Sequence, residues 1–184
     1  PETLETHWLQ EHAGHWRVTS LASRPGKLDW MPHNSPMIFG LRDPHGSDSL
    51  RVRRSFELVA GPDLDQSNYP PPDSPLLSAL GVRYLITRRA LADPWQLVYA
   101  GEAPIYENPH ALPRAHLQSV GQELASCPSG TVSFARDDPD AITLQVTTDQ
   151  SAELILTDSY YPGWRAWVDG EPTPIRCTNH AFRS

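Results

Sequence analysis

The sequence is poor in lysine and in long apolar runs, and each shortage limits what the chain can do. Lys27 is the only lysine, and 15 basic residues against 22 acidic ones leave a net charge of −7. This charge argues against a nucleic-acid partner, because a protein that binds phosphates needs a basic face. No stretch approaches the roughly 20 apolar residues that a membrane-spanning helix requires.

Motifs of catalysis and of metal binding are also missing. The sequence contains no Gly-x-Ser-x-Gly nucleophile elbow and no glycine-rich phosphate loop before a helix. His7 and His12 are five residues apart, which differs from the i, i+4 spacing that puts two ligands on one helix face. The acidic run Asp137 to Asp140 lacks the ligand spacing of a calcium loop and fits a solvated hairpin loop. We therefore predict no catalytic residue, no cofactor and no metal site, although a triad assembled from distant residues stays open.

Residues 1–92 predict a small α/β part. Thr3 is placed to cap a helix that runs to about Glu11, and Ser74 with Pro75 to begin another that Gly81 ends. The other predicted elements are strands at 16–21 and 82–87, a helical or mixed segment at 49–60, and loops at 25–46 and 61–75.

Residues 93–184 predict an antiparallel β-sandwich, so the fold class is α+β. Ile142, Leu144 and Val146 alternate with polar residues, as expected for a strand with one buried face. Short strands that recur between turn signals are typical of a sandwich. The predicted strands are 95–100, 103–107, 115–120, 131–135, 141–147, 152–158, 164–168 and 174–178.

The most informative segment of the sequence is residues 160–170, which contains the predicted strand 164–168 and the turn after it. Asp169-Gly170 suits a two-residue hairpin turn, whose central residues both need a positive φ. Alternation places Trp164 and Val168 on one face, which we expect to be buried, and Trp167 on the other. Asp158, just before this segment, is placed to bond backbone amides at the turn into Tyr160.

Four stretches of the sequence resemble the soluble region of bacterial YfhO-type membrane proteins, in the order that the family has them. They are GLRDPHGSDSL at 40–50, LSALGVRYLI at 77–86, IYENPHALPRA at 105–115 and LTDSYYPGWRAWVDG at 156–170. This family is similar to polytopic glycosyltransferases that use a lipid-linked sugar donor and has been linked to glycosylation of cell-envelope polymers.

The resemblance implies an extracytoplasmic domain on the outer face of the bacterial cell membrane, attached to a membrane portion of the same parent chain. The chain starts without an initiator Met or signal-peptide pattern and stops just after a hairpin, so we expect a piece of a longer protein. The family's catalytic acids lie in membrane loops that this sequence lacks. An extracytoplasmic setting would permit a disulfide between Cys127 and Cys177, and two separate thiols are the other interpretation.

The leading hypothesis is a non-catalytic domain that binds or orients a lipid-linked sugar or an envelope polymer. Tyr160, Tyr161 and Trp167 are the candidate carbohydrate-binding residues, because aromatic rings stack on the apolar faces of sugars; packing in the core is the other interpretation. A structural or assembly module that packs on the membrane portion or on a protein partner is the alternative function. An independent soluble enzyme is the third.

Overall fold

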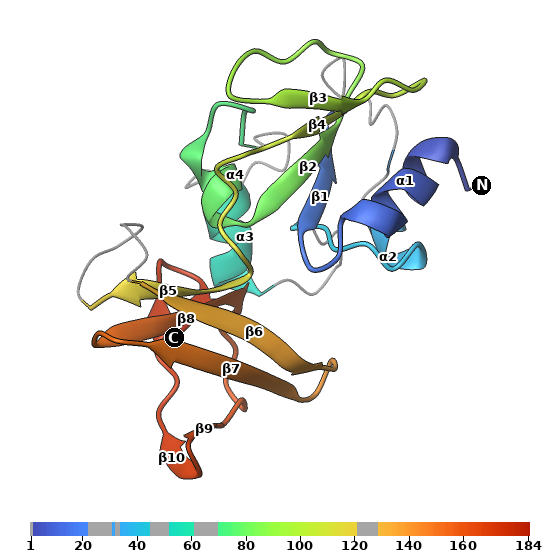
Figure 1. Cartoon of the computed structure of the whole chain (residues 1–184). Coiled ribbons are helices and arrows are strands. Elements are labelled where there is room, and N and C mark those ends of the chain that lie inside the picture. The colour runs from blue at the N-terminus through green and yellow to red at the C-terminus, as the bar shows by residue number, and fades with distance from the viewer. Residues whose placement is uncertain (1, 22–30, 32–33, 45–51, 61–69, 121–128) are drawn as a thin grey trace. The chain divides into compact units, whose positions relative to one another are not determined.

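The computed structural model describes residues 2–21, 31, 34–44, 52–60, 70–120 and 129–184. The chain divides into two compact units, Pro1–Pro113 and Arg114–Ser184 (Figure 1). This boundary differs from the predicted change after residue 92. The reason is that β3 (Gln96–Tyr99) and β4 (Ile105–Glu107) belong to the same sheet as β2 (Val82–Ile86), so the first unit extends past them.

Helices α1 and α4 of the first unit begin where the capping residues predict. Thr3 caps α1 (Leu4–His12) by accepting a hydrogen bond from the backbone N–H of Thr6, and the Thr6 side chain accepts from Thr3 in return. Ser74 accepts from Leu76 at the start of α4 (Pro75–Ala79), and Gly81 follows that helix with a φ of 69°. Two further short helices are α2 (Ser35–Ile38) and α3 (Arg53–Ala60).

The sheet of the first unit has the strand order β1-β2-β4-β3. Its first strand, β1 (Arg17–Ser20), is parallel to β2, and the other pairs are antiparallel. Parallel pairing needs a crossover, and the chain between β1 and β2 includes α2, α3 and α4. The strands predicted at 16–21 and 82–87 are confirmed as β1 and β2, and the structure pairs them in one sheet.

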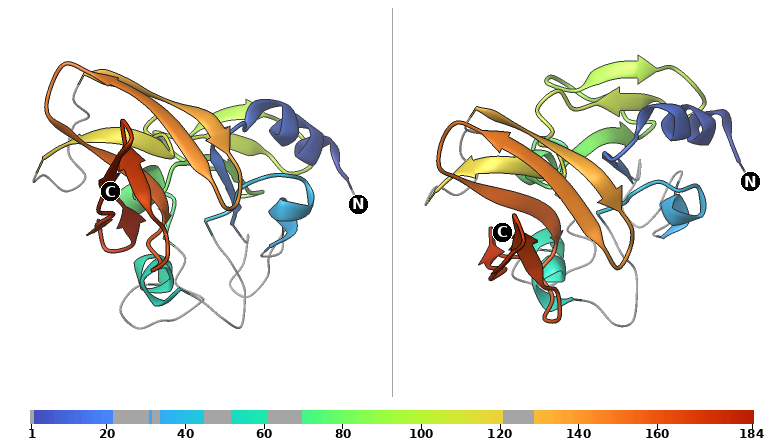
Figure 2. Two further views of the ribbon diagram at one scale, coloured as in Figure 1. Left: turned by 90° about the horizontal axis from the view of Figure 1, so that it is seen from below. Right: turned by 60° about the horizontal axis from the view of Figure 1, so that its bottom comes forward.

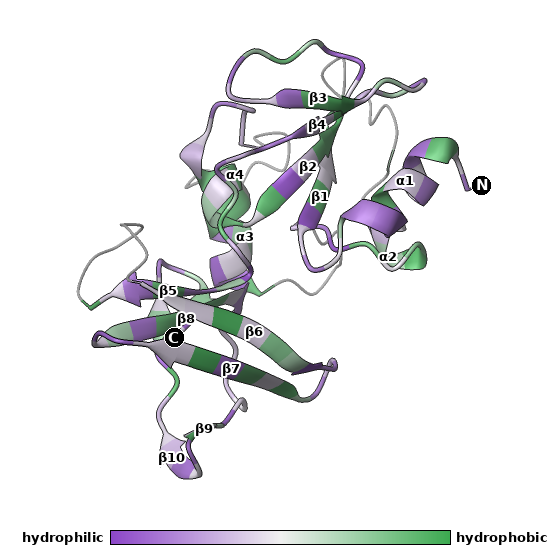
Figure 3. Cartoon of the chain, viewed as in Figure 1, coloured by the Kyte–Doolittle hydropathy of each residue, from purple (hydrophilic) through white to green (hydrophobic). Residues whose placement is uncertain are grey.

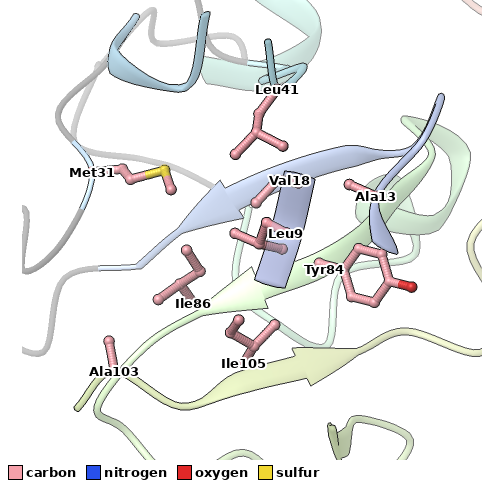
Figure 4. Close-up of a cluster of buried hydrophobic side chains, with 9 residues drawn as sticks. All are labelled: Leu9, Ala13, Val18, Met31, Leu41, Tyr84, Ile86, Ala103 and Ile105. Carbon is pink, nitrogen blue, oxygen red and sulfur yellow. The ribbon is translucent and has the colours of Figure 1, made fainter. Parts of the chain in front are cut away.

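An aliphatic core lies between α1 and this sheet, as Figure 4 shows. Leu9 of α1, Val18 of β1 and Ile86 of β2 are fully buried in it together with Ile105 of β4. Glu5 of α1 is also buried, and its Oε1 accepts a hydrogen bond from the backbone N–H of Ala103. Helix α1 is thus fixed to the sheet both by apolar packing and by this one carboxylate.

The described residues of the second unit form strands in three open sheets (Figures 1 and 2). The largest has the order β11-β12-β8-β5, with β8 (Ala152–Ser159) paired antiparallel to both neighbours. The remaining members are β5 (Ala115–Ser119), β11 (Cys177–Thr178) and β12 (Phe182–Arg183).

Two hairpins form the other sheets of this unit. The longer one joins β6 (Gly130–Asp137) to β7 (Ile142–Thr148), and apolar bands alternate with polar ones along both strands (Figure 3). Direct partners such as Phe134 and Leu144 share a face, as the period-two pattern predicts. The shorter hairpin joins β9 (Ala166–Val168) to β10 (Glu171–Thr173).

The described part of the chain is thus mostly strands in antiparallel sheets with few helices. The strand predicted at 174–178 is shortened to β11, and β10 lies before the predicted bounds. Much of the loops predicted at 25–46 and 61–75 lies outside the described residues.

Candidate functional site

The three predicted carbohydrate-binding residues lie on one segment of the second unit and differ in their exposure. Tyr160 follows β8 and is half-buried, and its backbone N–H donates to the carbonyl of Ala181 at 2.7 Å. Tyr161 is 59% exposed, and Trp167 on β9 is 60% exposed. No ring contact joins these three side chains in the part of the chain that the structure describes.

The hairpin that carries Trp167 has the predicted turn. Asp169 has a φ of 51° and Gly170 a φ of 88°, so both central residues adopt the positive values that a type I′ turn needs. Val168 pairs with Glu171 across this turn, and Trp167 pairs with Pro172. The two-residue turn therefore fixes the register of the whole hairpin.

Trp167 and Pro172 form an apolar pair on one face of the hairpin, because direct cross-strand partners point to the same side. Both are exposed. The pair flanking a two-residue turn exchanges hydrogen bonds, and the next pair does not, so a proline at 172 removes no ladder bond. This position explains how a proline fits in a strand opposite the indole.

The prediction that Val168 shares a buried face with Trp164 is wrong. Val168 is 58% exposed. Strand β9 pairs only with β10 in a two-stranded sheet, so alternation separates two faces of the hairpin without burying Val168 on its own face. The prediction that Trp167 lies at the surface is confirmed.

Trp164, at the base of the hairpin, packs against a buried arginine. The guanidinium carbon of Arg183 lies 4.3 Å from the centroid of the Trp164 ring, which is half-buried. The return segment is fixed beside it, because Arg176 and Ser184 exchange two backbone hydrogen bonds of 2.8 and 2.9 Å. Both ends of the hairpin segment therefore connect to the strand pair β11–β12.

Arg183 belongs to a buried ionic network that links β6, β8 and β12 with the residue preceding β5. Arg114, just before β5, donates from Nε to Asp158 Oδ1 at 2.8 Å and from Nη2 to Asp158 Oδ2 at 2.7 Å. Its Nη1 donates to both carboxylate oxygens of Asp137, at 2.9 and 2.8 Å. Arg183 Nη2 donates to Asp158 Oδ2 at 2.9 Å. Asp158 is thus shared by two guanidinium groups, and such charge-assisted forks fix orientation strongly.

The two arginines experience this network differently. Burial opposes the charge on Arg114, but the hydrogen bonds and charges of Asp158 and Asp137 outweigh it and raise the pKa of Arg114. Burial lowers the pKa of Arg183, and repulsion from Arg114 adds to this effect, while attraction to Asp158 opposes it. Arg114 is therefore the more strongly held cation.

Sequence reasoning missed this network. We expected Asp158 to bond backbone amides, and did not foresee that its carboxylate lies between Arg114 and Arg183. We expected Asp137 in a solvated loop, yet its side chain is only 13% exposed against Arg114. The available signal was the arginine in the ALPRA stretch, but spacing alone does not show which acids it meets.

The described residues contain no group of three or more His, Cys, Asp or Glu side chains placed to hold a metal ion. Within the same part of the chain, no helix is long and apolar enough to span a bilayer. Cys127 lies outside the described residues, so the disulfide stays a prediction. The Sγ of Cys177 lies 3.2 Å from the carbonyl oxygen of His180.

No protein-family model, curated protein or solved structure matches this sequence. The resemblance to YfhO-type proteins therefore stays a prediction drawn from the four stretches.

Proposed function

We propose that this chain is a non-catalytic carbohydrate-binding domain on the extracytoplasmic face of a polytopic, glycosyltransferase-like membrane protein. Its role would be to bind or orient a sugar donor or an envelope-polymer acceptor beside the membrane portion of the parent chain. The resemblance to YfhO-type proteins supports the setting. Tethering to the membrane portion would let even weak affinity act, because it raises the local concentration of the bound sugar.

The observation that carries the binding role is the exposed pair of Trp167 and Pro172 on a two-stranded hairpin. An indole beside a flat pyrrolidine gives a rigid apolar surface, on which the C–H groups of a pyranose ring can pack. Asp169 and Glu171, next to this pair in the sequence, supply acceptors for sugar hydroxyls at the tip. Tyr161 is a second exposed aromatic ring on the same segment.

We also propose that the β6–β7 hairpin and the β11-β12-β8-β5 sheet are the two layers of a sandwich. Arg114 supports this arrangement, because its side chain reaches Asp137 on β6 and Asp158 on β8. Gly130 on β6 lies so close to Leu117 on β5 that a Cβ at position 130 would overlap that leucine side chain.

One observation favours the alternative, an assembly module. Val168 is as exposed as Trp167 but lies on the opposite face of the hairpin. A sugar platform uses one face, whereas a hairpin inserted into a groove of the membrane portion or of a protein partner would use both. A substitution of Val168 therefore distinguishes the assembly module from the carbohydrate-binding domain.

The test is a calorimetric titration of the whole 184-residue chain with envelope saccharides, together with the variants Trp167→Ala and Val168→Thr. Loss of the indole should weaken binding by about tenfold, the equivalent of about 1.4 kcal/mol of stacking. Val168→Thr keeps the β-branched shape and should leave saccharide affinity unchanged. Val146→Ala, at an exposed apolar site elsewhere in the second unit, is the matched control.

The results distinguish the candidates. No saturable binding of any saccharide would remove the carbohydrate role. Association of the chain with the purified membrane portion that Val168→Thr and Trp167→Ala both weaken would favour the assembly module. The membrane setting itself is tested by the parent reading frame, which should encode several hydrophobic spans.

A further inference from the structure

The hairpin β9–β10 cannot set its own orientation. It is a separate two-stranded sheet, and a lone hairpin of two three-residue strands is marginally stable in water. Whatever holds Trp167 in a defined place must therefore act at the base of the hairpin, where the segments 160–165 and 174–177 leave the body of the unit.

At this base the return segment is held by the Arg176–Ser184 backbone pair, and the incoming segment is held at Tyr160. Tyr160 bonds to Ala181, and five residues then separate it from the first residue of β9. The segment between them contains Pro162 and Gly163, and Gly163 has a φ of 112°, outside the range that other residues adopt readily. Within this segment, the Trp164 side chain contacts the buried Arg183.

That contact leads to the ionic network. The face of Trp164 lies against Arg183, which is only 8% exposed and is bonded to Asp158. Asp158 is in turn fixed by the two-pronged hydrogen bonds of Arg114. A guanidinium held in this way presents a plane of defined orientation, and a cation stacked on an indole holds the ring in position.

We infer that Arg183 is a positioning residue, which sets the orientation of the Trp167 surface by stacking on Trp164. It touches no ligand itself. The inference rests on the proposed function for its biological meaning, but the order that it predicts at Trp167 is a property of the chain alone.

The experiment measures the mobility of the Trp167 indole N–H by NMR relaxation in the whole chain. The variant Trp164→Leu removes the ring that Arg183 stacks on, and Trp164→Phe restores an aromatic face. The heteronuclear NOE of the Trp167 indole should fall in Trp164→Leu and return toward the native value in Trp164→Phe. Saccharide affinity should weaken about fivefold in Trp164→Leu, while the melting temperature stays close to the native one. If Trp164 served stability alone, the melting temperature would fall instead.

Arg183→Lys is the second variant, since lysine keeps the ion pair with Asp158 but lacks the planar face. It should also lower the NOE of the Trp167 indole. A similar decrease of the Trp167 indole NOE in Trp164→Leu and in Arg183→Lys supports the inference. An unchanged NOE in Trp164→Leu overturns it, whether or not saccharides bind. If the NOE falls but the native chain binds no saccharide, the positioning inference holds and the carbohydrate role fails.

Discussion

The two units of the chain bury different chemistry. In the first unit, aliphatic side chains from α1, β1, β2 and β4 form one cluster, and the one described buried acid, Glu5, is bonded to a backbone N–H. In the second unit, two arginines are buried, and an aspartate is shared between them. The first unit is stabilised by burial of apolar side chains, and the second by burial of apolar side chains together with a buried ionic network.

This difference teaches what each arrangement contributes. Burial of apolar area stabilises without fixing direction, because the hydrophobic effect is non-directional. A buried ion pair adds little net stability over apolar side chains of the same volume, but removing one partner is costly. The network of the second unit therefore fixes geometry at the base of the exposed hairpin, where Arg183 contacts Trp164, and the proposed function would make use of a fixed geometry there.

The largest loss of stability is expected from a substitution that breaks the ionic network of the second unit. Asp158→Ala leaves two buried guanidinium groups without their shared carboxylate, so we expect a loss of about 3–5 kcal/mol in the free energy of unfolding of the second unit. Chemical denaturation followed by circular dichroism measures it. Asp138→Ala is the control, because Asp138 forms an exposed pair with Arg136 and its loss should not change stability measurably. Equal effects of the two variants would show that the buried network carries no special weight.

The next effect concerns the apolar unit. Leu9→Ala removes a fully buried side chain from the centre of the first core, and we expect a loss of about 3 kcal/mol. Leu4→Ala, at an exposed position of the same helix, should have little effect. A change below about 1 kcal/mol in Leu9→Ala would mean that α1 is held mainly by Glu5, and the contrast between the units would disappear.

The sequence predicted most of the local elements because their signals are local. Capping by Thr3 and Ser74, the positive φ of Gly81 and the Asp169-Gly170 turn each depend on a few neighbouring residues, and the structure confirms them. Strand alternation in 142–146 is a signal of the same kind.

What the sequence could not predict depends on pairing between distant residues. The boundary predicted after residue 92 differs from the division after Pro113, because β4 pairs with β2 and no local pattern shows which strands become neighbours. The ionic network could not be predicted for the same reason, since Arg114 and Asp158 are 44 positions apart in the sequence. Of the candidate site, exposure of Trp167 was predictable from alternation, whereas the contact of Trp164 with Arg183 was not.

A third prediction tests how closely α1 is fitted to the sheet of the first unit. A Cβ at Gly101 would overlap the Tyr99 ring and the Glu5 carboxylate, so Gly101→Ala should destabilise this unit by about 2 kcal/mol. Thermal or chemical denaturation checks it, with Ala100→Ser as a one-atom addition at the exposed neighbouring position. Unchanged stability in Gly101→Ala would show that Glu5 and Tyr99 move aside without loss.

The smallest effect is the pH dependence that Glu5 gives to the first unit. Burial raises the pKa of this carboxyl, but hydrogen bonds from backbone N–H groups, including that of Ala103, outweigh burial and leave the pKa lowered. A lowered pKa in the folded state means that the carboxylate stabilises above its unfolded pKa, and that this contribution is lost as the pH falls through the folded pKa.

Glu5→Gln isolates this contribution, because the amide oxygen can still accept from Ala103 but carries no charge. The native chain should be more stable than Glu5→Gln at pH 7, and the difference should vanish in acid, as urea midpoints from pH 7 to pH 3 would record. A difference that grows as the pH falls would contradict the sign of the shift. A stability difference that stays constant with pH would mean that Glu5 acts through its shape and not its charge. The first unit would then be stabilised by apolar packing without any contribution from a buried charge, which would sharpen its contrast with the second unit.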